Sequence, residues 1–156
     1  MMFRTHVLFG IFCSLLILSF YTFEDEILFF GVFVLCSVLP DIDMPRSRIG
    51  RRHRIVSSLL NVVFGHRGFV HTVFPALGLF ALLYSLGYFI LGMAAFLGYM
   101  SHLVLDMLTP EGVRLFHPFF DKTFRGFIRT SGFLEYAFFI ALIVAVAFQA
   151  GSYVFQ

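Results

Sequence analysis

Histidines and aspartates occur in this chain at spacings that suit metal binding. His102 and Asp106 are four residues apart, so on a helix they lie on one face, one turn from each other. Asp41 and Asp43 are separated by one residue, just after Pro40. In an extended backbone two such carboxylates point the same way. We therefore predict both pairs as metal ligands.

A third pair, His66 and His71, lies in a stretch that contains two glycines. A spacing of five does not align on a regular helix. The two rings can converge if His66 lies in a loop between Gly65 and Gly68 and His71 in the first turn of the next helix. Arg67 lies between them, and its guanidinium is suited to hold a phosphate in a bidentate fork, although it is also one of many basic residues. We predict the histidines as ligands and Arg67 as a phosphate-binding catalytic residue.

Imidazole and carboxylate together suit zinc, manganese or iron better than calcium. A catalytic zinc uses three or four ligands, so a larger set has room for two ions that share a carboxylate. Paired metals are typical of phosphoester hydrolysis. The full set of predicted ligands is His6, Asp41, Asp43, His66, His71, His102 and Asp106.

Each of these residues also has a simpler interpretation. His6, at the start of an apolar segment, is also typical of a polar residue at the membrane interface. His102 and Asp106 could form a hydrogen-bonded pair without any metal. Glu135 lies early in the last apolar segment, where an acidic side chain stabilises the helix dipole, and it is also a candidate general base or supporting residue. The joint placement of the ligands, rather than any single residue, favours a metal centre.

The elements that must position these residues are apolar helices. Of the 156 residues, 60% are hydrophobic and only 13% are charged, which excludes a disordered chain and an ordinary soluble enzyme. A helix that spans a bilayer needs about 20 apolar residues, so every apolar segment except the short second one is predicted to span. The expected fold is all-α, a polytopic membrane helix bundle that forms one domain over residues 1–156. The five apolar segments are His6–Phe23, Ile27–Leu39, Phe69–Leu86, Tyr88–Leu108 and Phe133–Phe155.

Basic residues give the expected orientation. If the helices alternate across the membrane, all eleven Lys and Arg residues fall on one side, in the N-terminus and in two polar loops, 40–68 and 109–132. The positive-inside rule then predicts a cytoplasmic N-terminus and an external C-terminus. The predicted ligands share the cytoplasmic side, where ionisable groups at membrane depth usually line a functional site. His53 is expected in a loop near anionic headgroups, and His117 in a loop apart from the site.

Four motifs occur in order along residues 5–136: Thr5-His6, Pro40-Asp41-Ile42-Asp43, His66-Arg67-Gly68-x-x-His71-Thr72 and Ser101-His102-Leu103-x-Leu105-Asp106-x-x-Thr109-x-x-Gly112. Their combination resembles the YdjM-like inner-membrane proteins, small multi-spanning proteins regarded as metal-dependent hydrolases. One departure is Met44, where many members of that family have His, so one ligand position has no counterpart here. A fainter resemblance, limited to His102 and Asp106, links the chain to the helical zinc-dependent phospholipase C and P1 nuclease group. It favours phosphoester substrates.

We therefore predict a hydrolase of the inner (plasma) membrane that contains zinc, or else manganese or iron. Its expected substrate is a phosphoester of a lipid or lipid-like molecule at the cytoplasmic face, and no nucleic-acid partner is expected. The alternative is a non-catalytic membrane protein whose metal is structural or transported. A transporter should place its ligands near the bilayer midplane, whereas these cluster at one end of the helices.

Overall fold

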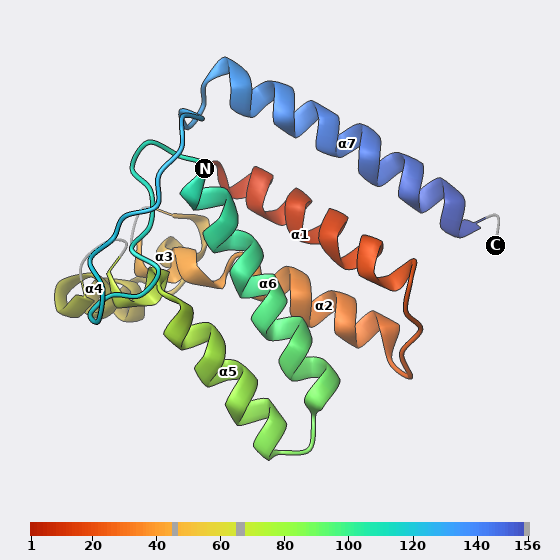
Figure 1. Cartoon of the computed structure of the whole chain (residues 1–156), viewed down its shortest axis with the longest axis horizontal. Coiled ribbons are helices and arrows are strands. Elements are labelled where there is room, and N and C mark those ends of the chain that lie inside the picture. The colour runs from red at the N-terminus through yellow and green to blue at the C-terminus, as the bar shows by residue number, and fades with distance from the viewer. Residues whose placement is uncertain (45–46, 65–67, 155–156) are drawn as a thin grey trace.

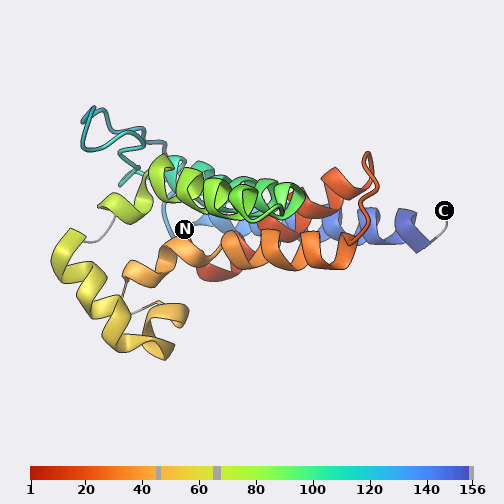
Figure 2. The ribbon, with the colours of Figure 1, turned by 90° about the horizontal axis from the view of Figure 1, so that it is seen from below.

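The computed structural model describes residues 1–44, 47–64 and 68–154 of the chain. Its longer helices lie side by side in one bundle, and two short helices lie at one end of it (Figures 1 and 2). Within the described residues the all-α prediction is confirmed, because the only strand-like pairing is a single bridge between Val113 and Phe124. In chain order the elements are α1 (Phe3–Leu18), α2 (Glu26–Cys36), the 3₁₀ helix η1 (Leu39–Asp43), α3 (Arg48–Arg52), α4 (Arg54–Phe64), the 3₁₀ helix η2 (Phe69–His71), α5 (Val73–Ser85), α6 (Phe89–Met107) and α7 (Phe133–Val154).

Only two of the described helices, α6 and α7, are long and apolar enough to cross a membrane. We predicted that the first and third apolar segments also span the membrane, and this is wrong because their helices, α1 and α5, are too short. Helix α1 has 16 residues and α5 has 13, or about 24 and 20 Å of helix. The reason is that the ends of both apolar runs form turns. After Leu18 the chain turns towards α2, and η2 occupies the start of the third segment.

Helix α6 is the centre of the bundle and packs against α1, α2 and α5. Two glycines allow the closest approaches. A side chain at Gly98 would overlap the backbone carbonyl of Phe33, so α2 lies directly on α6 one turn before His102. A side chain at Gly10 would overlap Ser37, so α1 lies against the end of α2. These contacts bring the ligand-bearing parts of α1 and α6 to the end of α2, which leads into η1.

The start of α1, the end of α6, both 3₁₀ helices and the start of α7 all lie at one end of the bundle (Figures 1 and 2). The short helices α3 and α4 lie at the same end, in a segment that we predicted to be a polar loop. Helix α7 packs against α1 and leaves most of its apolar surface exposed. An apolar helix exposed over most of its length is expected to face lipid.

Candidate metal centre

His102 of α6 is fully buried, and its ring is held by the end of α2. Its Nδ1 lies 2.9 Å from the backbone carbonyl oxygen of Ser37, the residue that follows α2. Because a carbonyl only accepts, Nδ1 carries the proton, and in a neutral ring Nε2 then presents a lone pair. That Nε2 lies 3.7 Å from Oδ2 of Asp106 and 4.0 Å from Oδ1 of Asp41. A lone pair therefore faces two carboxylates.

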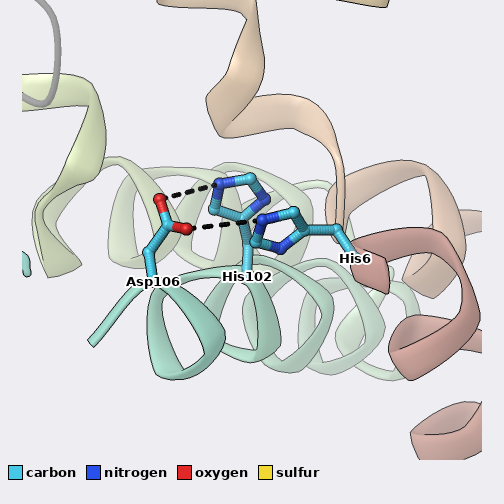
Figure 3. A group of neighbouring side chains, drawn as sticks. All are labelled: His6, His102 and Asp106. Carbon is cyan, nitrogen blue, oxygen red and sulfur yellow. Dashed lines mark ion pairs between the residues drawn. The ribbon is translucent and has the colours of Figure 1, made fainter. Parts of the chain in front are cut away.

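His6 of α1 enters the same cluster and faces the same carboxylate of Asp106 as His102 does (Figure 3). Its Nε2 lies 3.4 Å from Oδ1 of Asp106, and its ring stacks on that of His102 with centroids 3.8 Å apart (Figure 3). The α-amino group of Met1 lies 2.8 Å from the same carboxylate oxygen. Two protonated rings would repel each other strongly at this separation, so the stack is stable when no more than one of them is charged.

His71, in η2, lies between two aspartates. Its Nδ1 is 3.1 Å from Oδ2 of Asp43, and its Nε2 is 3.6 Å from Oδ2 of Asp106. A carboxylate bound to the outer nitrogen of a ligand histidine fixes the orientation of the ring and makes it a better donor. The structure thus places Asp43 behind His71, whereas we expected it beside Asp41 as a ligand. The hydroxyl of Tyr99 donates to the carbonyl of Val70 and holds this turn against α6.

The donor atoms lie close to the separations expected around a metal ion. Two ligand atoms at about 2.1 Å from a tetrahedral zinc lie about 3.4 Å apart. The measured separations run from 3.4 Å between His6 and Asp106 to 4.0 Å between His102 and Asp41. In addition, Nε2 of His102 has no hydrogen-bond partner among the described residues. The donors form two overlapping groups, each within 4.8 Å: His6 with His102 and Asp106, and Asp41 with His71 and His102.

Asp41 is the most accessible of these donors. Its side chain is 15% exposed, whereas those of His102 and Asp106 are at most 4% exposed. Burial raises the pKa of the Asp41 carboxyl, and the nearby histidines offset part of that effect. A cation at this position would favour the charged carboxylate. Asp41 therefore marks the side from which solvent contacts the cluster.

Glu135 of α7 is fully buried at the start of α1. Its Oε1 accepts hydrogen bonds from the backbone N–H of Met2 at 2.6 Å and from Oγ1 of Thr5 at 3.1 Å. Its Oε2 accepts one from the N–H of Ser131 at 2.7 Å. The carboxylate therefore ties α7 to the residues just before His6, an arrangement that favours a positioning role.

Of the remaining histidines and the predicted phosphate-binding Arg67, the structure describes only His53 and His117. His66 and Arg67 lie outside the described residues. His53 is exposed at the start of α4, and His117 pairs at 2.9 Å with Asp121 in the exposed connection between α6 and α7. His117 lies in a loop as expected, whereas His53 lies in the turn between α3 and α4; both are apart from the cluster.

The sequence analysis did not identify two residues that shape the centre. Ser37 acts through its backbone carbonyl, for which side-chain chemistry gives no signal. Tyr99 does have a signal, because it precedes His102 by three residues and Asp106 by seven, and these spacings place all three on one face of α6. Its hydroxyl contacts the turn that holds His71.

Comparison with known proteins gives the family. The family described as YdjM inner membrane protein matches residues 1–155. This chain belongs to the YdjM family. The inner membrane protein YdjM of Escherichia coli (strain K12) is 45% identical over 91 residues, which cover 54% of this chain and 46% of that protein. The YdjM of Shigella flexneri matches with the same values.

The chain spans about half the length of these two curated relatives. YvsG of Bacillus subtilis (strain 168) is 31% identical over 119 residues, which cover 74% of this chain and 72% of that protein. No solved structure matches the chain. Membership of the YdjM family confirms the resemblance seen in the motifs, and the chain is a membrane protein. The names of the two YdjM relatives place those proteins in the inner membrane and state no chemical activity.

Proposed function

We propose that this YdjM-family protein is a metal-dependent hydrolase that cleaves a phosphoester of a lipid or lipid-like substrate at the cytoplasmic face of the inner membrane. The observation that supports it most strongly is the orientation of His102. Its protonated nitrogen is engaged by Ser37, and its lone pair faces carboxylates in a buried site. A divalent cation between these groups would convert a repulsive arrangement into a favourable one.

Five described residues would hold the ion: His6, Asp41, His71, His102 and Asp106. Mixed imidazole and carboxylate donors favour zinc, with manganese or iron next. When bound, such an ion supplies Lewis acidity that lowers the pKa of a water molecule towards about 7. The two oxygens of Asp106 face different histidines, His6 and His71, so this carboxylate would also contribute to holding a second ion.

The substrate class is proposed from the surroundings of the cluster. The cluster lies at the end of the bundle that carries α3 and α4 with their exposed arginines, where the anionic headgroups of the inner leaflet would be its closest phosphoesters. Asp41 is on the accessible side, and we assign Arg67 to the phosphoryl oxygens because its planar fork suits phosphate. Glu135 supports the site by holding the start of α1.

A structural metal is the second candidate, and the burial of the three histidines favours it. A structural site is expected to have a closed set of protein ligands, whereas a catalytic site keeps one position open to solvent. The exposed part of Asp41 argues for access. Transport is less well supported, because His102 and Asp106 lie in the last two turns of α6 rather than at its middle.

The test combines metal analysis with turnover of a panel of lipid phosphates by the purified full chain. His102→Ala and Asp106→Ala should lose both metal and turnover, because each removes a direct ligand. His53→Ala and His117→Ala are matched controls that should keep both. Equal metal content in all four variants would refute the metal centre. A metal-loaded wild type that hydrolyses no phosphoester would support the structural candidate instead.

A further inference from the structure

The short helix α4 presents its apolar side chains away from the protein. Ile55, Leu59 and Val62 are spaced i, i+4 and i+7, so they share one face of the helix. Their exposed fractions are 79%, 61% and 84%. On a helix that borders water this face would be packed against the core.

The side of α4 that packs against the protein carries a small polar residue. Ser57 is fully buried, and its hydroxyl lies so close to Gly50 of α3 that a side chain there would overlap it. Helix α4 contacts α3 and η1, the 3₁₀ helix that carries Asp41. The usual orientation of an amphipathic surface helix is thus reversed. Such a reversal is favourable only where the surroundings are less polar than the protein surface that the helix covers.

Positive charge borders this apolar face. Arg51, Arg52 and Arg54 are all exposed, at the end of α3 and the start of α4. An exposed apolar face bordered by arginines matches an anionic lipid surface, which offers hydrocarbon below and phosphate above. A second copy of the chain is a poorer match, because it would bring the same positive charges to the contact.

The length and direction of α4 agree with a position at the membrane surface. Its 11 residues give about 16 Å of helix, too short to cross a bilayer. It runs across the direction of the bundle helices, at the end that carries the candidate metal centre (Figure 2). A helix in this position lies close to the plane of the membrane surface when the bundle spans the membrane.

We propose that α4 is an in-plane membrane helix that inserts Ile55, Leu59 and Val62 into the lipid and contacts anionic headgroups through Arg51, Arg52 and Arg54. The inference depends neither on a bound metal nor on hydrolysis. Because α4 packs on η1, it would also hold Asp41 at the depth of the headgroups.

The first experiment measures how deeply α4 is immersed. Single nitroxide labels are placed through Leu59→Cys, Val62→Cys and the control His53→Cys, an exposed residue just before the helix and outside its apolar face. The background is a Cys13→Ala, Cys36→Ala chain in phosphatidylglycerol vesicles. Labels at 59 and 62 should collide more with oxygen, which concentrates in lipid, and the label at 53 more with a water-soluble nickel chelate. Equal nickel access at all three positions would overturn the proposal, and so would labels at 59 and 62 shielded from both reagents, which indicates a protein partner.

The second experiment tests the charge. Neutral phosphatidylcholine vesicles, or an Arg51→Gln, Arg52→Gln, Arg54→Gln variant, should weaken insertion by roughly fivefold for each arginine that no longer binds a headgroup. Nickel access at position 59 should rise accordingly. The matched control, Arg125→Gln with Arg129→Gln, changes exposed arginines in another segment and should leave the label unaffected. Equal immersion in both lipids and in the triple variant would overturn the role assigned to the headgroups.

Discussion

Replacing Asp43 by Asn removes the carboxylate behind His71 while keeping the shape of its side chain. The Asp43 carboxylate lies 3.1 Å from Nδ1 of His71, and the other ring nitrogen lies 3.6 Å from Asp106. Loss of such an outer partner typically weakens metal binding by about 10- to 100-fold, which corresponds to about 1.4–2.8 kcal/mol. Asp106→Asn should weaken binding more, because it removes charge from a direct ligand.

The assay is the dissociation constant for zinc, measured by competition with a chelating fluorophore on the full chain in detergent. The Asp43→Asn change is made in the wild type and in a His71→Ala background, which gives a double-mutant cycle. If Asp43 acts through the ring of His71, it should cause no further loss once that ring is gone. Losses that multiply in the double variant would refute this reasoning. They would show that Asp43 contacts the ion directly.

Three further predictions concern other parts of the molecule. Arg67→Lys should leave metal content unchanged and lower phosphoester turnover by roughly 100-fold, because the planar fork is lost; wild-type turnover would contradict the assigned role. Glu135→Ala should lower the free energy of unfolding by about 3 kcal/mol, since three hydrogen-bond donors lose their acceptor, and an unchanged denaturation midpoint in detergent would contradict this. A reporter that works only in the cytoplasm should be inactive when fused after Gln156, and an active fusion would refute an external C-terminus.

Local spacing predicted which side chains lie together better than it predicted the helices around them. The four-residue interval between His102 and Asp106 is a helical repeat, and both residues lie on the inner face of α6. His71 and Asp41 also reach the cluster, as expected. The placement of Asp43 against His71 was not predictable, because two aspartates two residues apart diverge in the 3₁₀ turn that replaces the expected extended backbone.

Helix ends and the short helix α4 were the weakest parts of the sequence prediction. An apolar run does not show where the backbone turns, so the first segment was extended past Leu18 and the third began before Val73. The pattern of Ile55, Leu59 and Val62 was present in the sequence, but it lies in a stretch rich in arginine that suggested a loop. Neither the length of this stretch nor its apolar pattern shows that these side chains face away from the protein.

The hydrogen bond from His102 to the carbonyl of Ser37 restricts how this centre can change. The last carbonyls of a helix have no partner within the helix, and at membrane depth water does not satisfy them readily. His102 satisfies one of them with one nitrogen while presenting the other to the carboxylates. Cysteine at this position would offer a softer ligand, but it would lose that donor and leave the end of α2 unsatisfied. The fold therefore ties this position to imidazole, and under the proposed function this restricts which metals the site would select.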